Sequence, residues 1–390
     1  MSSSPPHRIL IVAGEVSGDQ HAAGLVRDLR AIRGDLEFYG IGGDALRGEG
    51  VDIWVDAREM ALVGLTEVVA HLPFLRRVFK RLETQLATDP PEVLLLVDYP
   101  GFNLRLAEAA HSRGIPVFYY ISPQVWAWHR SRIGRMARVL DLLMVIFPFE
   151  VDVFKETGLE TVFVGHPLVE SIQRTLAQPP IDLPWPPGGR RVALLPGSRK
   201  QEIQYVLPPM LETARELRRR DPSVAFLIPA ASPEIAQPIH DQLAALPAED
   251  RTAIAVVPGQ LREVVRQAQA AMVCSGTATV EVALIQCPMI VVYRTSWLTY
   301  WIGRWLVSVP WLGMVNLIAN RTLCPEFIQH AAEASAMADA IESLLGDTSA
   351  RQDQLAGFEQ IAAALQRGDG VPSAGAVVAA ALDRLRKDNA

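Results

Sequence analysis

Residues Val192–Ile203 read VALLPGSRKQEI, and this stretch indicates the fold class. Its first four residues are apolar, as in a strand buried inside a parallel sheet. The turn Pro196-Gly197-Ser198-Arg199 follows, and a helix is predicted from Glu202 and Ile203 onward. A strand, a tight turn and a helix start leave free backbone N–H groups at the carboxyl end of the strand. Such groups form a ready anion site.

Arg199 supports an anion site without deciding for it. A guanidinium can donate two hydrogen bonds to phosphate oxygens. An ordinary βα loop with a solvated arginine fits the same turn equally well. The turn is not a P-loop, because no Gly-Lys-Ser/Thr follows it.

Length and composition narrow the class of protein. The 390 residues are too many for one typical core and predict two domains. A content of 49% hydrophobic and 21% charged residues excludes a disordered chain, and a net charge of −6 gives no sign of nucleic-acid binding. Cys274, Cys287 and Cys324 lack metal spacing, and we expect reduced thiols in a cytosolic protein. Met1–Pro6 is not a cleavable leader, so we do not expect secretion.

The strand–turn–helix pattern also occurs near the N-terminus. Arg8–Ala13 reads as a strand, Gly14–Asp19 as a glycine-containing loop and His21–Ile32 as a helix. The loop is not GxGxxG, and no acidic residue ends the second strand, so a dinucleotide site is not indicated. The further strands predicted in this half are Leu36–Ile41, Val93–Val97, Val117–Ile121 and Leu142–Ile146.

A proline-rich stretch, Gln178–Gly189, reads as a linker, after which the pattern restarts. The strands predicted beyond it are Val192–Leu195, Val224–Ile228, Ile254–Val257, Ala271–Cys274 and Met289–Val292. The sequence therefore predicts an α/β protein with two Rossmann-like domains, residues 1–178 and 190–390, that face each other across a ligand-binding cleft. Ala331–Ala390 reads as closing helices without chemistry.

A third turn of this kind lies at Cys274–Glu281, CSGTATVE. Ser275 or Thr277 can cap the helix that follows, and Glu281 then favours the helix dipole. Alternatively, this turn and the Arg199 turn hold a nucleoside diphosphate from two sides, and Glu281 accepts the two ribose hydroxyls.

Ten segments of the chain, in the same order, resemble one family. They are AGEVSGD (13–19), GIGGD (40–44), VDYPGFN (97–103), SPQVWAWHRSRI (122–133), FPFE (147–150), VGHPLVE (164–170), LLPGSRKQEI (194–203), SGTATVEVAL (275–284), VNLIA (315–319) and CPEFIQ (324–329). The chain resembles the lipid-A-disaccharide synthase family, which are inverting glycosyltransferases of the two-Rossmann GT-B architecture.

The resemblance implies a specific reaction. UDP-2,3-diacylglucosamine condenses with 2,3-diacylglucosamine 1-phosphate (lipid X). The products are a β-1,6-linked lipid A disaccharide 1-phosphate and UDP. The resemblance also implies a homodimer, and a place in lipid A biosynthesis at the cytoplasmic face of the inner membrane of a Gram-negative bacterium. No cofactor is implied.

Site residues follow from the same resemblance. The general base falls on Asp98, in VDYPGFN where the family has an ADxPxFN-like segment. The nucleotide or donor site falls on Arg199, Glu281 and Asn316, and the two turns described above add Gly197, Ser198, Ser275, Gly276 and Thr277 to it. Independently of the resemblance, Glu15, Ser17 and Asp19 lie on the first loop facing the predicted cleft, and they either orient the sugar or acceptor phosphate or cap the following helix. Val315 stands where many members have proline.

The residues themselves leave alternatives open. Asp98 ends an apolar strand, and without the resemblance a loop-capping role comes first; partial burial would raise its pKa and suit a base. His21 is a second candidate base, although a solvated histidine is commoner. His166 either stabilises an interdomain turn or, less readily, contacts ligand. No metal spacing and no Asp-x-Asp occur, so we expect Arg199 and helix N-termini to replace a metal.

Two apolar segments suggest surfaces. Met60–Leu82 is apolar and then basic; it is either a core-facing helix with a solvated face or a membrane- and acyl-binding patch, which we favour for acylated substrates. Arg130, Arg132 and Arg135 bind phosphate or headgroups, or are solvated. Trp297–Ile318 is too interrupted to span a membrane and reads as an interdomain, dimer or membrane-edge helix, with Trp297, Trp301 and Trp305 on one face.

Rival functions are a non-catalytic UDP-sugar- or lipid-binding module, a GT-B epimerase and a glycosyltransferase with another acceptor. The presence of both Asp98 and Arg199 argues against the first. The basic, apolar segment Met60–Leu82 favours a lipid acceptor.

Overall fold

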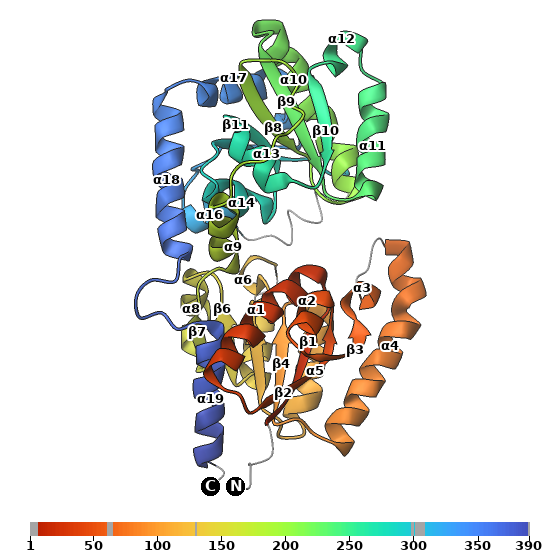
Figure 1. Ribbon diagram of the computed structural model, residues 1–390, viewed down its shortest axis with the longest axis vertical. Coiled ribbons are helices and arrows are strands. Elements are labelled where there is room, and N and C mark those ends of the chain that lie inside the picture. The colour runs from red at the N-terminus through yellow and green to blue at the C-terminus, as the bar shows by residue number, and fades with distance from the viewer. Residues whose placement is uncertain (1–6, 61–64, 129–130, 298–299, 301–308, 389–390) are drawn as a thin grey trace. The chain divides into compact units, whose positions relative to one another are not determined.

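The computed structural model describes the chain except for residues 1–6, 61–64, 129–130, 298–299, 301–308 and 389–390 (Figure 1). Two compact units compose it. The first unit comprises Met1–Pro167 with Arg367–Ala390, and the second comprises Leu168–Gln366. Each unit is an α/β fold around its own parallel sheet, as the sequence predicts.

The sheet of the first unit has the strand order β3-β2-β1-β4-β5-β6-β7. The strands are β1 (His7–Ala13), β2 (Leu36–Gly42), β3 (Asp52–Asp56), β4 (Val93–Val97), β5 (Val117–Tyr120), β6 (Leu142–Val145) and β7 (Glu160–Phe163). The order reverses between β1 and β4, where Ala13 pairs with Val97. Ligands of such sheets bind at this switch point, outside the carboxyl ends of the strands. The loop after Ala13 and the turn after Val97 are therefore neighbours at the expected ligand edge.

Helices cover both faces of this sheet. They are α1 (Val16–Ile32), α2 (Asp44–Gly48), α3 (Ala57–Met60), α4 (Leu65–Thr88), α5 (Pro100–His111), α6 (Val125–Trp128), α7 (Ser131–Val139), α8 (Phe149–Phe154), the 3₁₀ turn η1 (Lys155–Thr157) and α19 (Ala374–Asp388). The C-terminal helix α19 packs on α1 (Figure 1). The packing is close: a Cβ at Gly375 would lie 2.6 Å from the backbone nitrogen of Leu29.

The second unit repeats the design with the order β10-β9-β8-β11-β12-β13. Its strands are β8 (Arg190–Leu195), β9 (Val224–Ala230), β10 (Ile254–Pro258), β11 (Ala270–Cys274), β12 (Met289–Tyr293) and β13 (Glu326–Ile328). The reversal lies between β8 and β11, where Leu195 pairs with Val273. The turns after these two strands, Pro196–Arg199 and Ser275–Thr277, therefore meet at one edge.

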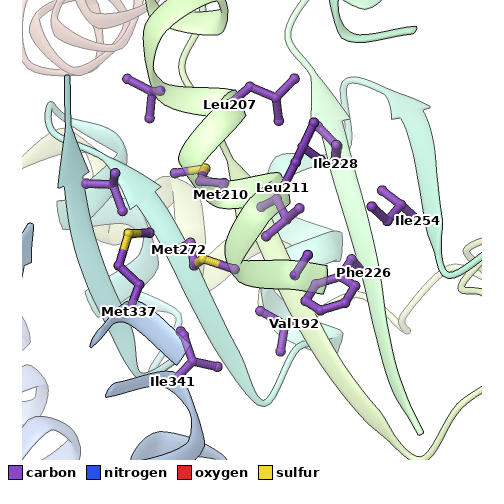
Figure 2. Close-up of a cluster of buried hydrophobic side chains, with 14 of the residues drawn as sticks. Val192, Leu207, Met210, Leu211, Phe226, Ile228, Ile254, Met272, Met337 and Ile341 are labelled. Carbon is purple, nitrogen blue, oxygen red and sulfur yellow. The ribbon is translucent and has the colours of Figure 1, made fainter. Parts of the chain in front are cut away.

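The helices of the second unit hold this sheet from both sides. They are α9 (Pro167–Leu176), α10 (Lys200–Arg220), α11 (Pro233–Ala244), α12 (Ala248–Arg251), α13 (Leu261–Gln267), α14 (Ala278–Leu284), α16 (Met314–Ala319), the 3₁₀ turn η2 (Gln329–Ala331), α17 (Ala334–Leu345) and α18 (Ser349–Leu365). Figure 2 shows α10 directing Leu207, Met210 and Leu211 into a core that also includes Phe226 of β9 and Met272 of β11. This burial fixes α10, and with it the turn that precedes the helix.

The domain boundaries differ from those predicted, 1–178 and 190–390. Residues 168–178 belong to the second unit, and residues 367–390 return to the first. Gln178–Gly189 is not a free linker, because it is bonded to α13: Gln267 donates to the carbonyl of Ile181, and the Trp185 indole donates to Gln267. The prediction missed these contacts because they join residues more than eighty positions apart.

Three strands escaped prediction, and one helix begins earlier than predicted. β3, β7 and β13 are short and only partly buried, so they lack the continuous apolar run of a central strand. α1 begins at Val16 rather than His21, which shortens the Gly14–Asp19 loop. Of the segment Trp297–Ile318, residues 298–299 and 301–308, including Trp301 and Trp305, lie outside the described residues. Trp297 itself is exposed.

Candidate functional site

Asp98 lies at the switch point of the first unit, directly after β4. It and Tyr99 are consecutive residues in the left-handed region, with φ of 47° and 50°. Each such non-glycine residue costs about 1–3 kcal/mol and persists where surrounding contacts hold it. The Asp98 N–H donates to the carbonyl of Tyr120, and the Tyr99 hydroxyl donates to the carbonyl of Met60. Asp98 thus stands on a strained, tightly held elbow between strand and helix.

The electrostatics of Asp98 suit a proton acceptor. Burial raises the pKa of Asp98 to about 6, and the nearby charge of Glu15 adds to the effect. A carboxylate with a pKa near neutrality accepts a proton more readily than an ordinary aspartate. His21 differs from the solvated histidine that we considered for it, because it is half-buried and burial lowers its pKa to about 4.

The acidic loop of the first unit divides into exposed and structural residues. Glu15 and Ser17 are exposed at the ligand edge. Asp19 is buried, and its carboxylate accepts from the backbone N–H groups of Gly43 (2.6 Å), Ala45 (3.0 Å) and Leu46 (3.2 Å). Asp19 therefore caps α2 rather than its own helix. Both oxygens of Asp19 are engaged in this structure, and a sugar or acceptor contact at Asp19 stays a prediction.

Glu150 is a buried carboxyl that the sequence did not single out. Its oxygens accept from the Trp126 indole (3.1 Å) and the Phe147 backbone (3.2 Å). Burial raises the pKa of Glu150 to about 8. The Phe147 ring also packs against His166, whose pKa burial lowers to about 3, so that His166 stays neutral. The motifs SPQVWAW and FPFE thus meet around Glu150, and the signal that the sequence offered was the presence of both motifs.

A cavity of about 470 Å³ opens in the second unit. Among its lining residues are Gly197, Ser198, Arg199, Ser275, Gly276 and Thr277. The structure therefore brings together the two turns that the sequence placed at the nucleotide site. The volume lies within the range of small-molecule sites, about 300–1,000 Å³.

The Arg199 turn is already bonded to a carboxylate. Oε2 of Glu202 accepts from the N–H groups of Ser198 (2.8 Å) and Arg199 (3.1 Å), and Oε1 accepts from the Arg199 guanidinium (3.2 Å). Gly197 has a φ of 112°, and a Cβ there would lie 2.3 Å from the Glu202 carboxylate. The backbone N–H groups of this turn therefore do bind an anion, here an internal one. The sequence assigned Glu202 only to the start of the helix.

The predicted caps in the third turn are not formed. The Ser275 hydroxyl donates instead to the carbonyl of Leu312 (2.7 Å), and Thr277 makes no side-chain cap at the start of α14. Ser275 is thereby fixed against the segment that leads into α16.

Glu281 is paired with an arginine that the sequence analysis missed. Its Oε1 accepts from Nε (3.1 Å) and Nη2 (3.0 Å) of Arg262. The other end of the same guanidinium donates to the Ser171 hydroxyl (2.8 Å). Glu281 lies one turn beyond the cavity-lining residue Ala278. Its Oε2 is not part of the arginine pair, so a ribose contact there remains a proposal.

Asn316 is fully buried, and its amide is saturated. Oδ1 accepts from the N–H groups of Leu323 and Cys324, while Nδ2 donates to the carbonyl of Cys324 and to Glu326. Glu326 in turn accepts from the N–H groups of Leu312 and Gly313. In this structure every polar atom of the Asn316 side chain is engaged within the protein, and a direct contact with the nucleotide stays a prediction. Its amide holds the segment against which Ser275 is fixed.

The basic segment of α4 forms the first of the two structures predicted for Met60–Leu82, a core-facing helix with a solvated basic face. Val78 and Leu82 are buried, Phe74, Leu75 and Phe79 pack against the core, and Arg76, Arg77, Lys80 and Arg81 are exposed. Residues 61–64 and the side chains to position 71 lie outside the description. Arg130 does too, and Arg135 is paired with Glu108. Throughout the described chain, no helix has the length and apolarity to cross a membrane.

The described part of the chain contains no group of three His, Cys, Asp or Glu side chains placed to hold a metal ion. The three cysteines are buried and unpaired with one another. Burial raises the pKa of Cys274 to about 12, so this thiol beside the cavity stays protonated.

Solved structures share this fold at low sequence identity. A putative UDP-N-acetylglucosamine 2-epimerase from Listeria monocytogenes superposes with a TM-score of 0.62 at 13% identity, covering 98% of this chain and 97% of its own. The glycotransferase of kitacinnamycin gives 0.61 at 15% identity, covering 98% and 99%. Their two-domain GT-B-type architecture is thus the architecture of this chain.

Sequence relatives are much closer. A lipid-A-disaccharide synthase from Syntrophus aciditrophicus is 44% identical over 88% of this chain and 90% of its own. One from Geobacter sulfurreducens is 39% identical over 94% and 95%. The family model described as Lipid-A-disaccharide synthetase matches residues 9–373. The chain therefore belongs to the lipid-A-disaccharide synthase family, glycosyltransferases of lipid A biosynthesis.

Proposed function

We propose that the protein transfers 2,3-diacylglucosamine from UDP to the O6 hydroxyl of 2,3-diacylglucosamine 1-phosphate, with inversion at the anomeric carbon. O6 forms the new bond to that carbon as its bond to the UDP oxygen breaks. The O6 proton passes to Asp98, and the bonding electrons leave with UDP. The products are the β-1,6-linked disaccharide 1-phosphate and UDP.

Asp98 carries the proposal. It is a carboxylate held rigidly at the ligand edge, and its pKa is raised to about 6 by burial and by Glu15. A base must be deprotonated to act, so turnover should rise as the pH rises through about 6. A diphosphate is a good leaving group, so no strong general acid is needed on the donor side.

The leaving diphosphate is assigned to the cavity of the second unit. The N–H groups of Ser198 and Arg199 already accommodate a carboxylate, and a diphosphate carries the same sign and greater charge. Donor binding then replaces Glu202 at those N–H groups, and Arg199 turns its guanidinium onto the phosphates. Gly276 and Thr277 line the same cavity. We assign Glu281 to the ribose, and Glu15 and Ser17 to the acceptor.

Incubation of the purified protein with both acylated substrates tests the reaction. Mass spectrometry should detect the disaccharide 1-phosphate and UDP in equal amounts, and NMR should show the β linkage. A retained α linkage would contradict the inverting mechanism. Conversion of a UDP-sugar without an acceptor would indicate an epimerase instead. Full activity after exhaustive chelation is expected, and loss of activity that Mg²⁺ restores would contradict the assignment of charge stabilisation to Arg199 and the helix N-termini.

We further propose that the protein associates with the inner membrane from the cytoplasmic side and acts as a homodimer. The exposed cations of α4, Arg76, Arg77, Lys80 and Arg81, support the first part, because basic surfaces are attracted to anionic lipid. Reversing the charge of the first three should weaken binding to anionic vesicles and leave binding to neutral vesicles unchanged. Light scattering measures the mass in solution.

A further inference from the structure

Two buried donors converge on the backbone carbonyl of Asp98. Nδ2 of Asn103 donates to it at 2.7 Å, and the Tyr119 hydroxyl donates to it at 2.5 Å. Asn103 and Tyr119 are both fully buried, on α5 and β5 respectively. A carbonyl in a left-handed turn has left the regular bonding of the strand, so these donors satisfy it in that conformation only.

The side-chain amide of Asn103 makes further contacts besides its hydrogen bond to the Asp98 carbonyl. Nδ2 also faces the carbonyls of Val97 (3.2 Å) and Val12 (3.4 Å), at the ends of β4 and β1. A flipped amide would point its oxygen at three carbonyl oxygens, so the contacts fix its orientation. Among the described residues, no group donates to Asn103 Oδ1. A buried acceptor without a donor is uncommon. Here it accompanies an amide nitrogen that lies 2.7 Å from the Asp98 carbonyl, where the elbow needs a donor.

Tyr119 stays a donor under all working conditions. Burial raises the pKa of its hydroxyl well above the ordinary value, and the charge of Asp98 raises it further. Tyr119 therefore contributes a neutral hydrogen bond whose target is the backbone of Asp98, not its carboxylate. Neither Tyr119 nor Asn103 lines the nucleotide cavity.

We propose that Asn103 and Tyr119 are positioning residues, which hold the Asp98 carbonyl in its left-handed conformation and so fix the direction of the Asp98 carboxylate toward the acceptor hydroxyl. This inference rests on the proposed function of Asp98 as the base. The two donors approach one atom from different elements, so the elbow cannot rotate without losing both bonds. A base displaced by about 1 Å can lose as much as a hundredfold in rate.

Tyr119→Phe is the principal test, because it removes one hydroxyl and keeps the ring. We expect kcat to fall by about tenfold, while KM for the donor and the dissociation constant of UDP stay within twofold. Tyr39→Phe is the matched control: it removes a buried hydroxyl from β2 that has no hydrogen-bond partner among the described residues. That variant should keep the wild-type kcat. Asn103→Ser, which shortens the donor, should lower kcat in the same way and provides the test if Tyr119→Phe does not fold.

The double variant with Asp98→Asn separates the two proposals. If the elbow acts through the carboxylate, Tyr119→Phe should not slow the residual rate of Asp98→Asn further. A wild-type kcat in Tyr119→Phe beside an inactive Asp98→Asn would overturn the positioning role and keep the base. A loss of UDP affinity, or a fall in kcat that Tyr39→Phe shares, would overturn it in favour of a merely structural role. Full activity of Asp98→Asn would overturn the base itself, and the positioning role with it.

Discussion

The turn after β4 and the turn after β8 both lie at the switch point of their own sheet, yet they are built differently. The first places two ordinary L-residues, Asp98 and Tyr99, in the left-handed region and holds them with buried donors. The second uses Gly197, which adopts a φ of 112° without a side chain, and offers its backbone N–H groups. The first turn therefore presents a side chain, whereas the second presents the main chain.

The difference matches two chemical tasks. A base must point in one direction, so a strained and fully bonded elbow suits it. A diphosphate must enter and leave, so its N–H groups need a partner that can be replaced. Glu202 is such a partner, because it lies on the helix that follows the turn and 21% of its side chain is exposed. Breaking each turn separately should therefore change different kinetic constants.

The largest effect is expected at Asp98. Asp98→Asn keeps the size of the side chain and removes the proton acceptor, so kcat should fall by about 10²–10⁴-fold. UDP affinity should stay as in the wild type, because the nucleotide cavity is assigned to the other turn. Steady-state kinetics and calorimetry measure the two quantities. Wild-type-like turnover would refute the base.

Arg199→Ala should give the next largest effect, and it should change the affinity for UDP rather than kcat. A hydrogen bond to a charged group contributes about 1.5–3 kcal/mol, so the dissociation constant of UDP should rise by about 10- to 100-fold. Arg190→Ala is the matched control, since this exposed arginine lies at the other end of β8 and pairs with Asp221. Equal losses of affinity in the two variants would remove any specific role for Arg199.

Gly197→Ala sharpens the comparison by giving the second turn a side chain. The new Cβ would lie 2.3 Å from Glu202 in a backbone conformation that L-residues avoid. We expect a loss of about 1–3 kcal/mol in unfolding free energy, together with weaker UDP binding. Gly158→Ala separates the two causes, because Gly158 also has a positive φ but has open space around it and lies outside the cavity. A loss of unfolding free energy at Gly158 as large as that at Gly197 would exclude the Glu202 contact as a cause.

The smallest change in turnover is expected at Glu150. Glu150→Gln mimics the neutral acid that burial favours in the folded unit. The pKa of Glu150 is raised on folding, so its stabilising contribution is complete below the unfolded pKa of about 4.3. That contribution is lost as the pH rises through about 8. Denaturant titrations from pH 5 to 8 should show a smaller loss of stability in Glu150→Gln than in the wild type; identical slopes would contradict the buried neutral acid.

The central strands and the turns at the ligand edge could be predicted from the sequence, because each is marked by a local pattern of residues. Val93–Val97 is continuously apolar and buried, and the residue after it, Asp98, is at the edge where parallel sheets bind ligands. The half-exposed strand Glu160–Phe163 carries no such pattern and was missed. The structure confirms the strands that carry such a run, whereas the missed strands β3, β7 and β13 lie at sheet edges and depend on their neighbours in space.

Side-chain roles that depend on distant partners could not be predicted. Asp19 has the position of a loop ligand, but its partners begin at Gly43, on the next loop of the sheet. Asn316 carries a family motif, but its four hydrogen bonds are made to residues 323–326. Arg262 was not singled out because nothing near it in the sequence indicates Glu281. In each case the partner is defined by the tertiary structure and not by spacing.

The return of α19 to the first unit affects how this chain can be made on a ribosome. The second unit is one uninterrupted stretch, Leu168–Gln366, and all of it is synthesised before α19. The face of α1 that α19 covers therefore stays without its partner helix until the second unit has been synthesised. Domains generally fold as units while synthesis proceeds, so the second unit can be complete while the first, although begun earlier, still lacks its final helix.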